Sequence, residues 1–184
     1  MPTLESIRLA MTVLPIIIAP DPRLKVKCRP VERVDAQIRR LMDDMLETMY
    51  LAPGIGLAAP QIGVNSRIIV VDAAREGEDR QPMRLANPEI VWASPEMIAC
   101  EEGCLSLPNQ YADVTRPAEA RIRYIDHDNE IREIQVKGLL STCIQHEMDH
   151  LDGVLFVDHL SNLRRDVILR KLVKARKTQA TVGA

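Results

Sequence analysis

The sequence predicts an α+β fold, in which mostly antiparallel sheets pack around a central helix, with one further helix near the N-terminus and another at the C-terminal end. Segments with helical periodicity and segments with strand periodicity both occur in the chain. They do not alternate regularly, as the crossover helices of a parallel sheet would require. The length of 184 residues suits a single domain with one sizeable core.

The first predicted element is an amphipathic helix, because apolar residues recur at positions 38, 41, 42, 45, 46 and 49. Asp35 is placed to cap its N-terminus, and the helix must end before Pro53. Methionines occupy three of these positions. They could form an adaptable binding stripe, but methionine at helical spacing is usually core filler, and we favour that interpretation.

Strand signals follow at residues 67–72, 83–86 and 97–100. Residues 121–126 and 131–137 flank a turn-rich tetrad at 126–129, which predicts a hairpin. Two more helices are expected over residues 139–151, stopping at Gly153, and over residues 161–177. Met11 lies just ahead of an apolar segment, so the predicted domain spans residues 11–184 and residues 1–10 form an N-terminal extension.

Composition excludes several classes of function. The net charge of −2, from 24 basic and 26 acidic residues, gives the chain as a whole no electrostatic basis for sequence-specific nucleic-acid binding. No apolar run approaches the roughly 20 residues of a membrane span. Four scattered cysteines and a start without a secretory pattern predict a reducing cytoplasm rather than a disulfide framework.

The strongest chemical signal is His-Glu-Met-Asp-His at residues 146–150, inside a predicted helix. Residues four apart lie one turn above each other, so His146 and His150 can bind one metal ion while Glu147 reaches a water molecule beside it. The alternative is a solvated helix with two surface histidines. The apolar residues around the motif argue against that alternative.

A catalytic metal site needs a third protein ligand and one open position. Downstream, His159 does not have the spacing of a zinc-peptidase ligand, whereas Asp152 and Asp158 remain candidates. Upstream, Cys104 follows Gly103 at a predicted strand end or tight bend. An isolated buried cysteine is usually an inert thiol, but as a thiolate Cys104 would complete a Cys-His-His set.

Three separated motifs occur along the chain: Gly-Ile-Gly-Leu-Ala-Ala-Pro-Gln at 54–61, Glu-Gly-Cys-Leu-Ser at 102–106, and Gln-His-Glu-Met-Asp-His-Leu-Asp-Gly at 145–153. In their order and separation they resemble the motifs of peptide deformylases, and the resemblance extends over about residues 12–175. It implies a bacterial cytoplasmic hydrolase that removes the formyl group from the N-terminal formylmethionine of nascent chains. It also implies Fe²⁺ as the metal, with Zn²⁺, Ni²⁺ or Co²⁺ as substitutes.

The same resemblance assigns roles to individual residues. Cys104, His146 and His150 would be the metal ligands, and Glu147 the general acid/base. The side chain of Gln61 and the backbone N–H of Leu105 would donate hydrogen bonds to the formyl oxygen. The expected substrate-binding residues are Ile55, Gly56, Glu102, Gly103, Leu139 and Cys143, the last two as walls of the methionine pocket.

Supporting residues are expected around this set. In the family Glu102 pairs with a downstream arginine, for which Arg116 is the candidate, and Tyr111 replaces an arginine that many members carry. Asp149 could orient a ligand histidine or could be a solvated helix residue.

The predicted C-terminal helix is strongly basic, with seven cations between Arg164 and Lys177 against the single acid Asp166. Such a run is usually a solvated face. In this family it resembles an element that docks on the ribosome, so the expected partners are formylmethionyl nascent peptides and the ribosome.

Two alternatives remain beside the deformylase interpretation. A small zinc peptidase would use the same helix with an acidic third ligand and would not need Cys104. A structural zinc module would use Cys143 as a fourth ligand and would leave no position for water.

Overall fold

The computed structural model describes residues 12–182, with side chains described to residue 178. The predicted extension at residues 1–10 lies outside this range. Three helices and seven strands confirm the α+β class. In order, the elements are η2 (Pro22–Lys25), α1 (Ala36–Leu51), β1 (Gly56–Ala58), η3 (Ala59–Ile62), β2 (Ile68–Val71), β3 (Met83–Ala93), β4 (Met97–Cys104), β5 (Leu107–Pro117), β6 (Glu119–Ile125), β7 (Ile131–Lys137), α2 (Gly138–Leu151), η4 (Phe156–His159) and α3 (Asn162–Val182).

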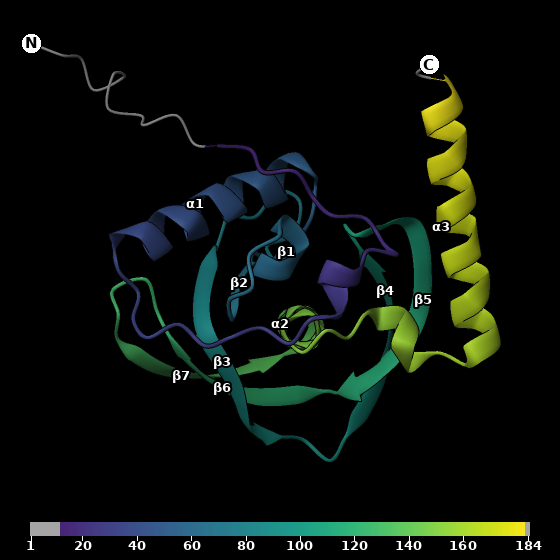
Figure 1. Ribbon diagram of the computed structural model, residues 1–184. Helices are drawn as coiled ribbons and strands as arrows, with labels where there is room; N and C mark the ends of the chain where they lie inside the picture. The colour runs from purple at the N-terminus through teal and green to yellow at the C-terminus, as the bar shows by residue number, and fades with distance from the viewer. Residues whose placement is uncertain (1–11, 183–184) are drawn as a thin grey trace, which may run out of the picture.

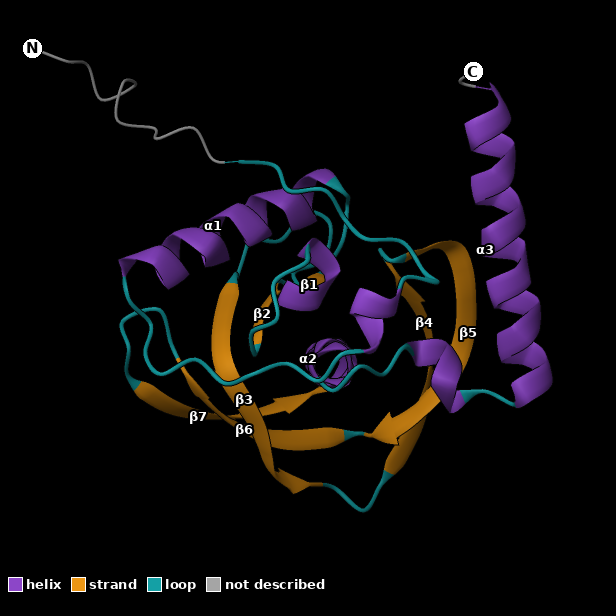
Figure 2. Cartoon of the chain, viewed as in Figure 1, coloured by secondary structure: helices purple, strands orange, loops and turns teal. Residues whose placement is uncertain are grey.

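The strands form two sheets, and every pairing between neighbours is antiparallel. Five strands lie in the order β1-β2-β3-β6-β7, and β4 pairs with β5 in a separate hairpin. Figure 1 shows α2 end-on at the centre of the molecule, with strands of both sheets around it and α1 on the opposite side from β6 and β7. The coloured elements of Figure 2 show the same arrangement. The predicted central helix is therefore confirmed.

The first helix, α1, has the predicted cap and face. The Asp35 carboxylate accepts from the backbone N–H of Ile38 at 3.0 Å. Met42, Met45 and Met49 are fully buried in one cluster with residues of β1 and β2. The methionine stripe is thus core, as the sequence favoured.

Helix α2 is buried nearly all round because it lies between the two sheets. Ile144 and Leu151 pack into the core of the five-stranded sheet. Gly153 follows the helix in a left-handed conformation (φ 73°), which glycine adopts without strain and which ends the helix as predicted. The polar face of α2 is directed elsewhere, toward the β4–β5 hairpin.

The longest element that the sequence did not predict is β5, a strand of eleven residues that no local pattern indicated. Its sequence contains Pro108, Asn109 and Asp113, which are rare in strands, and its partner β4 compensates for their low propensity. The hairpin between β6 and β7 was predicted, and it turns where Asp126 accepts from the N–H groups of Asp128 and Glu130, both at 2.9 Å.

Helix α3 contacts the body along a narrow stripe only. Leu172 is buried and Ile168 and Leu169 are half-buried against a third apolar cluster that contains Phe156. Three other apolar side chains of α3 remain exposed: the exposed fractions of Leu163, Val167 and Val173 are 73%, 40% and 37%. Figure 1 shows α3 standing beside β5 and extending past the body.

Among the described residues, no helix has the length and hydropathy that a membrane span requires.

Candidate active site and metal centre

The three predicted metal ligands meet where α2 crosses the end of β4. The thiol of Cys104 and one ring nitrogen of each of His146 and His150 lie within 4.8 Å of one another. Cys104 Sγ is 3.2 Å from His150 Nε2. Both imidazoles are buried, with exposed fractions of 7% and 1%. The i, i+4 spacing on α2 brings the two rings to the same side, as expected.

An irregularity at the end of β4 turns the cysteine toward α2. Gly103 is paired with Tyr111, whereas the next residue, Cys104, is paired with Leu107. This shift of register marks a β-bulge, which re-aims side chains at strand ends. The Tyr111 ring lies directly over Gly103, where an added Cβ would come within 2.6 Å of it. A side chain at position 103 would therefore have to displace the Tyr111 ring.

Glu102 and Arg116 support the site from the hairpin. Arg116 donates to Glu102 Oε1 from Nε at 2.5 Å and to Oε2 from Nη2 at 3.0 Å. His146 Nδ1 lies 2.8 Å from Glu102 Oε2. A carboxylate on Nδ1 fixes the ring orientation and leaves Nε2 available as a ligand. The expected pairing of Glu102 with Arg116 is present in the structure.

This network bears on two expectations about individual residues. Glu102 lines the small pocket described below, but both of its carboxylate oxygens already have partners within the protein, so it also holds His146 and Arg116 in place, and its expected substrate contact stays a prediction. Asp149 does not orient a ligand histidine: its carboxylate accepts from Arg116 at 2.9 Å and lies 2.7 Å from His159 Nε2. The helix directs Asp149 away from the rings of His146 and His150.

Electrostatics within the network favour an ionised Glu102. Burial acts to raise the pKa of Glu102, but the hydrogen bonds from His146 and Arg116 outweigh it and lower the pKa to about 2. Burial lowers the pKa of His150 well below its usual value, with a further contribution from His146. His150 is therefore neutral, which is the form that binds a metal.

Glu147 lies beside the ligands with its carboxylate buried. Glu147 Oε2 has no hydrogen-bond partner among the described residues. Burial raises the pKa of Glu147 to about 7. Gly56 on β1 lies close to this carboxylate: a Cβ there would collide with Glu147 Oε1 and come within 2.8 Å of Cys143 Sγ. The site therefore offers a proton acceptor near neutral pH, and a side chain at position 56 would collide with it.

Two hydrogen-bond donors face the same region. Gln61 accepts from the backbone N–H of Ala58 at 2.8 Å, which fixes its amide. Its Nε2 then donates to Ser106 Oγ at 3.0 Å and lies 3.5 Å from Cys104 Sγ. The backbone N–H of Leu105, next to Cys104, is used by no hydrogen bond among the described residues. Ser106, which the sequence did not single out, is the residue that aims Gln61.

A cleft of about 670 Å³ opens onto His146 and Glu147. One wall is the segment before and including β1, with Ile55 and Gly56, and the other is the end of β4 with the start of β5. Tyr111, with 63% of its surface exposed, stands at the rim.

A smaller pocket of about 90 Å³ lies beside the cleft and contains the expected methionine-pocket residues. Its lining includes Ile55, Gly103, Leu139 and Cys143. Cys143 Sγ donates to the Ile55 carbonyl oxygen at 3.4 Å, and burial raises the pKa of its thiol well above the usual value. Cys143 therefore stays protonated and lies outside the ligand cluster, which removes it as a fourth metal ligand.

The two acidic residues that the peptidase alternative offers as a third ligand have other partners in the structure. Asp152 accepts from Arg67 at 2.9 Å, and Asp158 pairs with Lys25 and accepts from the Leu155 N–H. Neither belongs to the group of potential ligand atoms found among the described residues, whereas Cys104 does.

Comparisons with known proteins agree with this geometry. The family model described as polypeptide deformylase matches residues 13–166. A peptide deformylase of Rhizobium meliloti is 54% identical over 92% of this chain and 97% of its own. One of Methylocella silvestris is 56% identical over 92% of this chain and 88% of its own.

The fold has a close counterpart among solved structures. The crystal structure of peptide deformylase from Ehrlichia chaffeensis superposes with a TM-score of 0.88 and 39% identity, covering 92% of this chain and 99% of that one. The family match, the curated relatives and the shared fold agree with one another. This chain therefore belongs to the peptide deformylase family, whose members are enzymes that remove the N-formyl group from nascent peptides.

Proposed function

We propose that Cys104, His146 and His150 hold one divalent metal ion in this hydrolase, and that Glu147 is its general acid/base. The observation that carries the proposal is the convergence of three ligand atoms beside a buried carboxylate oxygen without a partner. A thiolate and two imidazoles suit zinc and ferrous iron, and three protein ligands leave a position open for chemistry.

In the proposed mechanism, each of these residues has a separate role in the hydrolysis of the formyl amide. When bound, the metal supplies Lewis acidity, which activates water and polarises a carbonyl group. Glu147 accepts a proton from the attacking water, and the remaining hydroxyl forms a bond to the formyl carbon. Gln61 Nε2 and the Leu105 N–H donate hydrogen bonds to the formyl oxygen as its negative charge develops. Glu147 then returns the proton to the leaving amine as the C–N bond breaks, which releases formate.

The peptide end of the substrate fits the walls of the cleft. Gly56 on β1, with Ile55 just before it, and Gly103 on β4 lie on opposite sides of the cleft, and a peptide can lie between them as an added strand. The methionine side chain then enters the small pocket, where Leu139 and Cys143 supply apolar surface. Residues 11–184 act, in this proposal, as one catalytic domain for formylmethionyl nascent chains.

The function is tested by formate release from formyl-Met-Ala-Ser beside metal analysis. We expect the wild-type protein to release formate and to carry about one metal ion per chain. Cys104→Ser should lose most of both, whereas Cys100→Ser, on the same strand but outside the site, should keep both. Formate release from a metal-free wild-type sample at the full rate would contradict the proposal.

We further propose that the metal in the cell is Fe²⁺, with Zn²⁺, Ni²⁺ and Co²⁺ able to replace it. A ferrous ion beside the thiolate of Cys104 places two oxidisable partners together. Protein purified without oxygen should therefore contain iron, and in air the iron form should lose activity faster than the nickel or zinc form. Equal decay of all three forms would count against iron.

The proposed location is the bacterial cytoplasm, with the ribosome as a partner of α3. All four cysteines are free, which suits a reducing compartment. On the outer face of α3, Arg170, Lys174 and Lys177 surround apolar surface that includes the exposed Val173. Such a basic face suits phosphate-rich RNA. Replacing these three cations with glutamate should weaken ribosome binding and make its salt dependence shallower, and unchanged binding would contradict docking through this face.

A further inference from the structure

A second hollow, of about 720 Å³, lies next to the cleft on the side of α3. It lies between the extended segment at residues 15–18, the start of β5 and one face of α3. The two hollows adjoin, because they share the lining residues Ile16, Ile18, Pro108, Asn109 and Gln110. Nothing in the catalytic chemistry accounts for this second space.

The segment at residues 15–18 has a free backbone edge along both hollows. The Ile17 N–H donates to the Gln61 carbonyl at 2.7 Å, and the Ala19 N–H donates to the Ser106 carbonyl at 2.8 Å. In an extended chain, alternate residues present their backbone groups to opposite sides. Ile16 and Ile18 therefore face away from these partners, and no hydrogen bond within the described range uses their backbone. Such an edge can accept an extended peptide.

The charges around the second hollow are unequal. Three cations, Arg23, Lys171 and Arg176, line it together with one carboxylate, Asp21. Arg23 donates to both Asp21 oxygens, at 3.0 and 2.8 Å. These hydrogen bonds from Arg23 lower the pKa of Asp21 to about 2, so the two charges are paired at neutral pH. Lys171 and Arg176 make no hydrogen bond or ion pair within 4.0 Å among the described residues.

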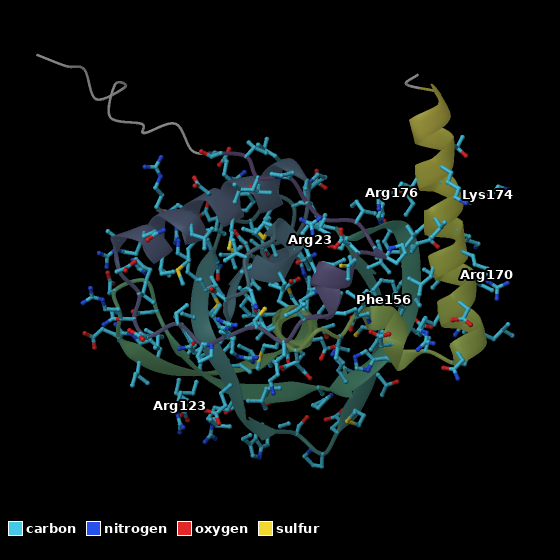
Figure 3. The ribbon with its side chains drawn as sticks, in the orientation of Figure 1. Arg23, Arg123, Phe156, Arg170, Lys174 and Arg176 are labelled. Carbon is cyan, nitrogen blue, oxygen red and sulfur yellow. The ribbon has the colours of Figure 1, made fainter. Side chains whose placement is uncertain are left out.

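The two faces of α3 differ in what they meet. Figure 3 shows Arg176 on the side of α3 that faces Arg23, whereas Arg170 and Lys174 project from the other side. The cavities agree with this view: Arg170 and Lys174 line a separate hollow together with Pro20 and Leu169, whereas Lys171 and Arg176 line the second hollow. These four cations of α3 therefore lie in two separate groups.

We propose that the substrate chain, beyond the residues held in the cleft, continues into the second hollow, and that Lys171 and Arg176 favour substrates with carboxylate side chains there. This inference rests on the proposed function, because it deepens the substrate preference of the same site. The hollow supplies a backbone edge for an extended peptide and a net positive charge for Asp or Glu. Exposed ion pairs are weak individually, so two of them should change binding about three- to tenfold.

The experiment uses the metal-loaded full-length protein and a series of formyl-Met-Ala-Ser peptides extended with Gly and Ala. An Asp-Asp pair is moved through positions 4–5, 6–7 and 8–9, and each peptide is matched by Asn-Asn and Lys-Lys versions. We expect one position at which the Asp-Asp peptide has a KM about three- to tenfold below that of its Asn-Asn match, with kcat unchanged. The preference should shrink in 0.5 M salt, because exposed charges are screened.

Two double variants with the same change of charge identify the face responsible. Lys171→Glu/Arg176→Glu should abolish or invert the preference for Asp-Asp, whereas Arg170→Glu/Lys174→Glu, on the outer face, should keep it. The proposal is overturned if no position discriminates between Asp-Asp and Asn-Asn. It is also overturned if both double variants lose the preference equally, since that would indicate only the general field of α3.

Formyl-Met-Ala-Ser itself separates this inference from the proposed function. The tripeptide is too short to extend beyond the cleft, so its turnover reports on the catalytic site alone. If wild-type protein does not deformylate the tripeptide, the proposed function fails. If it does, and the longer peptides show no charge preference, only the extended binding path fails.

Discussion

Glu147 has a carboxylate oxygen that is buried and lacks a partner among the described residues. A buried polar group without a hydrogen bond costs stability, and such groups persist at sites where they have a chemical role. Its neighbours on α2 face either the ligand cluster or the core, so the carboxylate is directed at the cleft. A pKa of about 7, raised by burial, suits a group that must take up and release a proton in each cycle.

We predict that Glu147→Gln separates metal binding from turnover. Glutamine has nearly the same shape but cannot accept the proton, so formate release should fall by about 10²- to 10⁴-fold. The metal content should stay at the wild-type level, because Glu147 is not among the converging ligand atoms. Rapid kinetics and metal analysis of one preparation check both. Loss of the metal, or turnover within a few fold of wild type, would contradict the assignment.

At the scale of residues, the sequence predicted which side chains lie close together at the site better than it predicted the hydrogen bonds between them. The spacing of His146 and His150 fixes their common face through helix geometry alone. The connection of His146 to Glu102 joins α2 to β4, and no local pattern encodes such a contact. The sequence leaves open whether Asp149 orients a ligand histidine or is a solvated helix residue, and the structure shows neither, because its carboxylate is bound to Arg116 and lies beside His159.

At the scale of elements, helices with a strong apolar period and strands with a strong local signal were predictable, whereas β1 and β5, whose sequences have weak strand propensity, were not. Asp35 and the methionines of α1 give a local signal that the structure confirms. β1 is only three residues long, and its sequence Gly-Leu-Ala has no strand preference. It is a strand because Leu57 pairs with Val70 and is buried between α1 and β2. Tertiary contacts of this kind override weak local propensity.

The end of α1 is fastened to the end of β2 by one hydrogen-bond network. The Tyr50 hydroxyl donates to Asp72 Oδ2 at 2.6 Å, and Asp72 also accepts from the N–H groups of Ala74 and Gln81. The Asp72 N–H in turn donates to the Ile55 carbonyl at 2.8 Å. The network therefore positions the cleft wall from a point outside the metal centre.

The hydrogen bond between Tyr50 and Asp72 stabilises the fold only over a limited pH range, because both groups titrate. Burial acts to raise the pKa of Asp72, but the hydrogen bonds from Tyr50 and the backbone outweigh it and lower the pKa below the usual 3.8. The resulting stabilisation is present above pH 3.8 and is lost as the pH falls. Burial, together with the hydrogen bond to Asp72, raises the pKa of Tyr50 from 10.0 to about 12, so its contribution is present below pH 10 and is lost as the pH rises toward 12.

We predict that Tyr50→Phe lowers the free energy of unfolding by about 1 kcal/mol at pH 7. The difference from wild type should shrink below about pH 3.8 and again above pH 10. Urea unfolding at pH 3, 7 and 11 measures it. Tyr124→Phe is the control, because burial raises the pKa of Tyr124 but no aspartate accepts from its hydroxyl, so its effect should not change in acid. A constant difference for Tyr50→Phe at all three values would contradict this origin.

At the scale of the whole molecule, the site lies where two separate sheets meet. The five-stranded sheet and the β4–β5 hairpin share no strand pairing, and α2 lies between them. On one side α2 contributes Ile144 and Leu151 to the core of the large sheet. On the other side its polar residues reach the hairpin, where Gln145 donates to the Pro117 carbonyl at 3.0 Å. Residues of the candidate site from both sheets therefore meet beside one helix.

A metal bound by Cys104 and the two histidines would cross-link β4 to α2, and so one sheet to the other. We therefore predict that removing the metal from wild-type protein lowers the melting temperature. At a metal concentration of about 1,000 times Kd the loss is about 4 kcal/mol, which corresponds to about 8–16 °C for a chain of this size. Adding zinc should restore the original value.

Two cysteine variants on the same strand decide whether the cross-link is the cause. Cys104 and Cys100 both lie on β4, but only Cys104 belongs to the group of potential ligands. In Cys104→Ser, stripping the metal should change the melting temperature much less, because the bond between sheet and helix is already missing. Cys100→Ser should behave as wild type. If calorimetry shows the same stripping effect in both variants, the metal stabilises the fold from somewhere other than the junction of β4 and α2.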